Sequence, residues 1–242
     1  MGWPDLAGAL WLIAAGLLIV AGLIGLAVWD ARRRRSPAVV LDVASAIARL
    51  WVAFAGVGAI LAVWRQFSGD VWVADVPVVV DVPGLSCEGA EAPVTATAPT
   101  LVCGSVSSVD LTVAGLDIGM RMLLAVGDLL AIVVVATPGL LLAIACSQTL
   151  KGAPFSRVVG RWLLIGALVV LVAGLGSELL SSLGRTVISH ELFPDHGADV
   201  VSTGIYRVGV SFWPIGAAFA LAALGAIFRH GERLQRETAG LV

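Results

Sequence analysis

The chain has 242 residues, of which 59% are hydrophobic and only 13% are charged. Ordinary soluble domains have about 45–50% apolar and about 25% charged residues, so this composition excludes a soluble globular enzyme. The mean hydropathy of +0.98 makes the bilayer the solvent for most of the chain, and the formal net charge of -2 does not indicate a nucleic-acid partner.

Five stretches are long and apolar enough to span a membrane, which takes about 20 mainly apolar residues. In chain order they cover residues 6–29, 43–64, 122–145, 162–183 and 208–228. Helix is the expected form of each, because unpaired backbone groups are costly in lipid. The predicted fold class is therefore an all-α membrane protein, a five-helix transmembrane bundle in contact with the lipid bilayer.

The distribution of basic residues predicts the orientation. Four consecutive arginines, residues 32–35, follow the first predicted span, and no basic segment precedes it. The positive-inside rule places them in the cytoplasm, which predicts an uncleaved anchor helix with the N-terminus outside and the C-terminus inside a bacterial plasma membrane. The other basic residues expected inside are Arg49, Lys151, Arg157, Arg161, Arg229, Arg233 and Arg236. Those expected outside are Arg65, Arg121, Arg185 and Arg207.

The loop between the second and third spans differs in composition, being rich in Val, Asp, Pro, Ser and Thr. Alternation predicts a strand with Asp75 and Asp81 on one face. The other face of this strand carries Trp72, Ala74, Val76, Val78, Val80 and Val82. Further strands are predicted at 100–103 and 109–113, which together give a small β-rich extracytoplasmic insertion.

These elements divide the chain into five segments. They are an N-terminal anchor helix (1–30), an arginine cluster with the second span (31–65), the β-rich outer loop (66–121), a three-span bundle (122–228) and a cytoplasmic tail (229–242). Small residues at helical spacing in the last two spans predict close packing within the bundle, with a homodimer face as the alternative.

Two of the three cysteines, Cys87 and Cys103, fall in the outer loop. On an oxidising side of the membrane this predicts a disulfide between them, worth about 3 kcal/mol in the chain-entropy model. A redox switch is the alternative. Cys146, at the cytoplasmic end of the third span, is expected to be a free thiol that packs as a small apolar side chain.

Two carboxylates, Asp128 and Glu178, lie inside predicted spans, where a charge costs about 2.5 kcal/mol or more. Counting from the outer helix ends puts them at similar depths, about 9 Å and about 7.5 Å. As a pair they could share a proton or bind a cation. The structural alternative is that each bonds a nearby hydroxyl or an interfacial arginine; the candidates are Ser177, Ser181, Ser182, Arg65, Arg121 and Arg185.

No enzymatic motif or metal site is predicted. The outer segment 190–199 contains histidine and carboxylate side chains suited to zinc, but Pro194 and Gly197 break any helix there, which favours a solvated acidic loop. Gly-x-Ser-x-Gly, P-loop and His-Glu-x-x-His patterns are all missing from the sequence. We therefore expect a protein that is not an enzyme and has no catalytic residues, cofactor or metal.

The cytoplasmic loop SQTLKGAPFS at 147–156, followed by Arg161, resembles the G-x-P-F loop of domain-of-unknown-function family 2975. The ending FRHGERLQ at 228–235 resembles the basic F-R-x-G-x-x-L exit helix of this family of small bacterial membrane proteins. The resemblance covers about the second to fifth spans and implies a four-helix core with an extracytoplasmic segment after its first helix. The extra first span and the long outer loop depart from that pattern. Members often lie beside small helix-turn-helix regulators, which implies a regulatory partner but supplies no catalytic residues.

The inner face is the predicted partner surface, formed by Lys151, Phe155, Arg157, Arg229 and Arg233. Topology and attraction to anionic lipid are the alternative explanation of its charge. The predicted function is that of a non-enzymatic envelope sensor or a membrane anchor for a cytoplasmic regulatory protein, with no direct nucleic-acid contact. The alternative is a transporter or channel component that uses Asp128 and Glu178.

Overall fold

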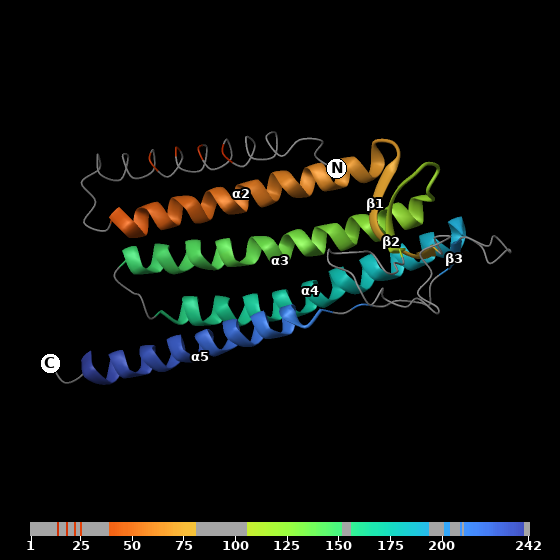
Figure 1. The fold of residues 1–242 in the computed structure, drawn as a ribbon. Coiled ribbons are helices and arrows are strands. Elements are labelled where there is room, and N and C mark those ends of the chain that lie inside the picture. Colours follow the sequence, from red (N-terminus) through yellow and green to blue (C-terminus); the bar gives the residue numbers. More distant parts are fainter. Residues whose placement is uncertain are drawn as a thin grey trace, which may run out of the picture. The chain divides into compact units, whose positions relative to one another are not determined.

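The computed structural model describes residues 39–80, 106–151, 156–193, 201–203, 209 and 211–239, together with Ala14, Leu18, Gly22 and Gly25. The elements, in chain order, are α2 (Val39–Phe67), β1 (Val71–Val80), β2 (Val106–Val113), α3 (Ile118–Leu150), α4 (Arg157–Leu192), β3 (Val201–Thr203) and α5 (Trp213–Ala239) (Figure 1). All four of these helices are long and apolar enough to cross a membrane.

The structure thus confirms helices at four of the five predicted spans. The predicted span at 6–29 lies outside the described residues, apart from four isolated helical positions, so the fifth helix of the bundle stays a prediction. With 33 and 36 residues, α3 and α4 are about 50 Å and about 54 Å long at 1.5 Å per residue. A hydrocarbon core of about 30 Å is shorter than either helix, so both helices have turns to spare outside it.

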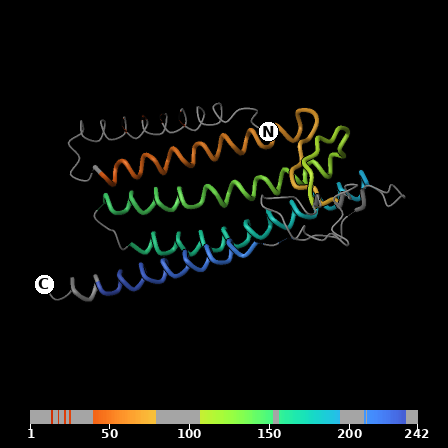
Figure 2. Tube along the Cα trace, in the orientation of Figure 1, coloured from red at the N-terminus to blue at the C-terminus, as the bar shows by residue number. Residues whose placement is uncertain are grey.

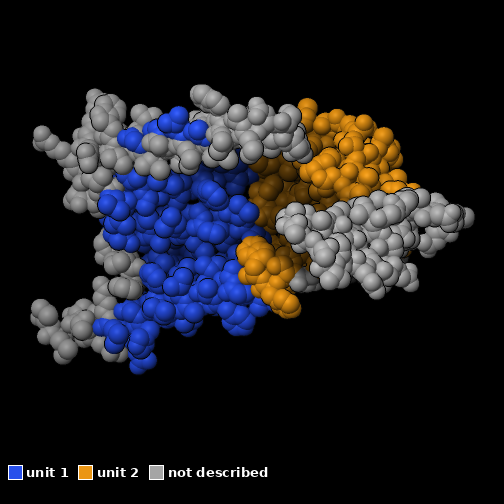
Figure 3. All heavy atoms as spheres, in the orientation of Figure 1, with its two compact units in different colours: residues 1–57, 133–171, 215–242 blue, residues 58–132, 172–214 orange. Residues whose placement is uncertain are grey.

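The chain divides into two compact units (Figure 3). Unit 1 contains Met1–Val57, Val133–Leu171 and Ile215–Val242, and unit 2 contains Gly58–Ile132 and Val172–Pro214. Within each unit, consecutive helical segments run in opposite directions, which the trace in Figure 2 follows. Six residues connect α3 with α4, whereas 50 residues connect α2 with α3 and 20 connect α4 with α5.

In unit 1, α3 accommodates a proline in its interior. Pro138 has no N–H, so the carbonyl of Val134 loses its helical partner. Neighbouring carbonyls receive side-chain donors: Thr137 Oγ1 donates to Val133 O at 2.7 Å, and Trp51 Nε1 donates to Val135 O at 2.8 Å. The two donors therefore lie on either side of the carbonyl that the proline leaves without its helical partner.

Glycines set the close helix contacts of unit 1. A Cβ on Gly139 would lie 2.5 Å from Trp51 Cδ1, so the indole fits against α3 only because this residue has no side chain. A Cβ on Gly225 would lie 3.3 Å from the carbonyl oxygen of Gly160, which brings α4 and α5 close together. These intrachain contacts agree with the packing role expected of small residues.

In unit 2, the three strands form an antiparallel sheet in the order β2-β1-β3. The predicted strand at 109–113 is confirmed as part of β2, and the predicted strand at 100–103 lies outside the described residues. Strand β3 was not predicted. It adds only three residues, and it pairs with the end of β1 at Val78–Val80.

The predicted alternation along β1 is wrong, because a bulge between Val73 and Val76 reverses the strand's faces; a second register shift lies between Pro77 and Val80. Val73 pairs with Leu111 but Val76 pairs with Val109, so β1 carries one extra residue. Asp75 lies in the bulge with φ of 56°, a left-handed conformation that aspartate tolerates better than most residues, and its N–H donates to Asp110 Oδ1 at 3.0 Å. The buried face therefore contains Val71, Val73, Val76 and Val78, while Trp72 is exposed.

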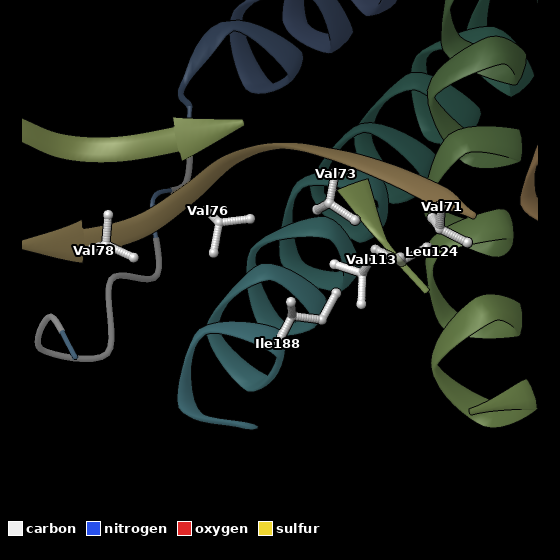
Figure 4. Packing of buried hydrophobic residues seen from close by; sticks show 7 residues of the cluster. All are labelled: Val71, Val73, Val76, Val78, Val113, Leu124 and Ile188. Carbon is white, nitrogen blue, oxygen red and sulfur yellow. The ribbon is translucent and has the colours of Figure 1, made fainter. Parts of the chain in front are cut away.

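These valines join helix residues in one hydrophobic cluster (Figure 4). Its members are Val71, Val73, Val76, Val78, Val113, Leu124 and Ile188. Leu124 comes from α3 and Ile188 from α4, and both Val76 and Ile188 have no exposed surface. Ser189 Oγ also donates to the carbonyl oxygen of Pro77 at 2.6 Å. The sheet therefore packs directly on these helices.

Candidate functional site

Asp128, the first of the two predicted intramembrane carboxylates, is bonded to a residue of α2. The amide Nε2 of Gln66 donates to Asp128 Oδ2 at 2.9 Å. Asp128 lies on the third turn of α3, four residues after Leu124, so the two side chains share a helix face. The carboxylate therefore lies one helical turn from the hydrophobic cluster under the sheet.

Gln66 is the most deeply buried member of this group, with 4% of its surface exposed. Its Oε1 is buried and has no hydrogen-bond partner among the described residues. An unpaired buried acceptor of this kind costs about 1–3 kcal/mol, so it calls for a physical explanation.

Arg121 completes the polar group at the end of α2. Its Nη1 donates to the carbonyl oxygen of Gln66 at 2.9 Å, and its Nε donates to the carbonyl oxygen of Leu116 at 3.0 Å. The guanidinium thus satisfies backbone carbonyls at the end of α2 and before α3, where helix ends leave groups without partners. Arg121 is one of the six candidate partners that the structural alternative offers for the two carboxylates, but the structure pairs Asp128 with Gln66.

Glu178, the second predicted carboxylate, is bonded to the chain just before α5. Its Oε2 accepts a hydrogen bond from the backbone N–H of Ser211, two residues before the first residue of α5. A negative charge is favourable near the N-terminus of a helix. One turn earlier on α4, Gly174 leaves room for the buried ring of Pro214, because a Cβ there would lie 2.6 Å from the proline Cβ. Glu178 and Gly174 together hold the start of α5 against α4.

Sequence reasoning found both carboxylates but neither of their partners. Gln66 lies two residues beyond the predicted end of the second span, and Ser211 contributes only a backbone N–H, which no side-chain pattern reveals. The signal for Gln66 was available: it is an amide side chain that follows Arg65 at the end of the predicted apolar span. The structure gives each carboxylate its own partner and does not pair the two with each other.

An apolar groove of about 690 Å³ lies beside the end of α2. Its lining residues are Ala59, Ile60, Val63, Trp64 and Phe67 of α2, Ser68 directly after this helix, and Leu129 of α3. Only Ser68 contributes a polar side chain, so the groove suits an acyl chain or an apolar helix face and not a polar ligand.

The predicted partner surface is described in part. Arg157 begins α4, and its Nε is 2.9 Å from Glu232 Oε1 of α5. The side chain of Arg229 passes Gly160, where a Cβ would lie 3.0 Å from the arginine Cγ. Lys151 is exposed in the turn that ends α3, and Arg233 is exposed on α5. Phe155 lies outside the described residues.

The predicted disulfide between Cys87 and Cys103 also lies outside the described residues. Cys146 is a free thiol with 4% of its surface exposed. Within the described parts of the chain, no group of three or more His, Cys, Asp or Glu side chains is placed to hold a metal ion.

No protein-family model, curated protein or solved structure matches the chain. The resemblance to domain-of-unknown-function family 2975 therefore stays a prediction, and functional inference depends on the site itself.

Proposed function

We propose that the chain is a non-enzymatic membrane protein that senses a condition of the envelope through its sheet and passes it to a cytoplasmic regulator. The observation that supports this is the shared hydrophobic cluster of sheet and helices. Three residues separate α2 from β1 and four separate β2 from α3, so the sheet has no long tether on these sides. A rearrangement of the sheet must then shift the helix ends that share its core.

The proposal retains the orientation given by the positive-inside rule, with the sheet outside a bacterial plasma membrane. The regulator would contact the opposite side, at the basic surface that contains Lys151, Phe155, Arg157, Arg229 and Arg233. Membership of domain-of-unknown-function family 2975 belongs to the same proposal, since that family implies a regulatory partner. In this arrangement α4, one uninterrupted helix from Arg157 to Leu192, carries the displacement.

The experiment compares two substitutions in the sheet. Their effect is measured as the labelling rate of a cysteine introduced at the end of α3. In a Cys146→Ala background, Leu150→Cys puts a thiol at the exposed last residue of α3. We expect Val76→Ala, which opens a cavity in the shared cluster, to change the labelling rate of this thiol several-fold. The matched variant Ser107→Ala, at an exposed position of β2, should leave the rate unchanged. Equal rates in both variants would show that the sheet is not coupled to α3.

The alternative function is a transporter or channel component, which the intramembrane position of Asp128 and its contact with Gln66 favour. The backbone contact of Glu178 with Ser211 argues against a joint role for the two carboxylates. Proton or cation flux in liposomes that is lost in both Asp128→Asn and Glu178→Gln would support this alternative over the sensor.

A further inference from the structure

The carboxylate of Asp128 lies within a candidate membrane span and has one neutral hydrogen-bond donor as its partner. Among the described residues, no basic side chain lies within ion-pair distance of it. Arg121, which is two turns away on the same helix, is directed at the backbone carbonyl oxygens of Gln66 and Leu116. The negative charge of Asp128 therefore lacks a counter-charge within the described part of the chain.

The second observation is independent of this charge. Gln66 is 4% exposed, its Nε2 is bonded to Asp128, and its Oε1 has no partner among the described residues. The two amide atoms share one carbon, so the unpaired Oε1 belongs to the same planar group that binds the carboxylate. Gln66 is also the second-last residue of α2, where the helix dipole is negative.

We propose that Asp128 and Gln66 bind a small monovalent cation of the sodium type, through a carboxylate oxygen and the amide Oε1. A cation supplies both the missing counter-charge and the missing partner of Oε1. A proton on Asp128 would neutralise the charge but leave Oε1 unpaired, and a water molecule would pair Oε1 but leave the charge. Divalent cations bind sites with several carboxylates, and among the described residues no group of three or more His, Cys, Asp or Glu side chains is placed to hold a metal ion.

The position of this site gives the cation a structural effect. Asp128 follows Leu124 by one turn, and Leu124 belongs to the hydrophobic cluster under the sheet. A bound cation joins Gln66 of α2 to Asp128 of α3, one helical turn from that cluster. Occupancy therefore stabilises unit 2, and this holds whether or not the sheet acts as a sensor.

The test measures thermal stability of the full chain in nanodiscs of neutral phospholipid, while sodium replaces choline at constant ionic strength. The unfolding temperature should rise with sodium and saturate, because a ligand that binds only the folded state stabilises it. Asp128→Asn should abolish the rise. Gln66→Met, which keeps the side-chain length without the amide, should weaken the apparent sodium affinity about tenfold.

Glu178→Gln is the matched control, since it neutralises a carboxylate of the same unit that has its own backbone partner. It should keep the full sodium response. An unfolding temperature that ignores sodium, or responds equally in Asp128→Asn, would overturn the proposal; so would dependence on pH alone, which would indicate a protonated carboxyl. If Asp128→Asn does not fold, saturable binding of radioactive sodium to the unmodified chain decides the question, and its absence overturns the proposal.

Discussion

Each of the two units, taken by itself, is stabilised by its own set of internal contacts, and the two sets differ. Unit 2 combines a tightly buried cluster of strand valines with hydrogen bonds that join distant residues, such as Gln66 with Asp128 and Ser189 with Pro77. Unit 1 consists of helical segments that approach at glycines, with a small apolar cluster, one hydrogen bond between distant residues (Trp51 with Val135) and an ion pair whose arginine is exposed. The cluster of unit 2 draws on two strands and two helices, so one substitution there affects several elements at once, whereas each glycine contact of unit 1 joins only two helices. We therefore expect unit 2 to be the less tolerant of substitution.

The largest effect is expected from a charge in the sheet cluster. Val76→Asp places a carboxylate where no surface is exposed, so the free energy of unfolding should fall by about 4 kcal/mol or more. Ser107→Asp, on exposed β2 surface, should change it by less than about 0.5 kcal/mol. Denaturant titration of both variants in detergent measures the difference. Comparable stability would mean that the sheet does not depend on this cluster.

The next effect concerns the predicted outer disulfide. Reduction should lower the free energy of unfolding by about 3 kcal/mol if Cys87 and Cys103 are bonded. In the unreduced folded protein no cysteine should react with a thiol reagent, because Cys146 is buried and the other two are bonded to each other. After denaturation without reductant, only Cys146 should react. Labelling of Cys87 and Cys103 before reduction would exclude the bond.

Hydrophobicity alone was sufficient to predict α2 to α5, although each helix differs in extent from its predicted span. Residue 162, for example, was the predicted start of a helix that begins at Arg157 and ends at Leu192. Hydropathy measures the preference of side chains for lipid, and it does not register helical turns that continue past the lipid. The extra turns of α4 include Ile188 and Ser189, which the sheet covers.

The details of the sheet and the site were harder to predict. The pattern from Val71 to Val80 contains valines in both alternation registers, so periodicity could not locate the bulge at Asp75. The bulge depends on a hydrogen bond to Asp110, 35 residues later in the chain. The partners of Asp128 and Glu178 likewise come from distant segments, and only the folded chain brings them together.

A close helix contact in unit 2 should be sensitive to one methyl group. Gly174→Ala adds a Cβ 2.6 Å from Cβ of Pro214, whose ring has little freedom to move, so we expect a loss of about 1–3 kcal/mol. Gly216→Ala is the control, because no atom lies within 4 Å of the added carbon. Thermal unfolding of the two variants compares them. Equal unfolding temperatures would indicate that α5 adjusts to the added methyl group.

In unit 1, removing a single hydrogen bond should have a smaller effect. Trp51→Phe keeps an aromatic ring but removes the donor to Val135 O beside Pro138, which should cost about 1 kcal/mol. Trp64→Phe changes a tryptophan that is 72% exposed and should cost less. Denaturant titration distinguishes them, and a greater loss in Trp64→Phe would show that α2 depends more on its exposed face than on this bond.

The smallest effect is expected at the pair between Arg157 and Glu232. The arginine side chain is 75% exposed, so solvent screens the attraction and Arg157→Gln should lower the free energy of unfolding by less than about 1 kcal/mol. Arg157→Lys should preserve most of the stability, since the lysine keeps the charge. Both differences should disappear in about 1 M salt, where the screening length falls to about 3 Å.

This last pair also tests whether the inner surface is covered. Denaturant titration of the purified chain at low and high salt should give a small, salt-dependent difference, because the arginine of this pair is exposed. The same variants are then compared in native membranes, where a bound regulator would cover this pair. A loss that becomes larger and insensitive to salt there would mean that the pair is desolvated, because burial removes the screening. An unchanged, salt-sensitive loss would show that Arg157 stays in solvent and that its charge serves topology alone.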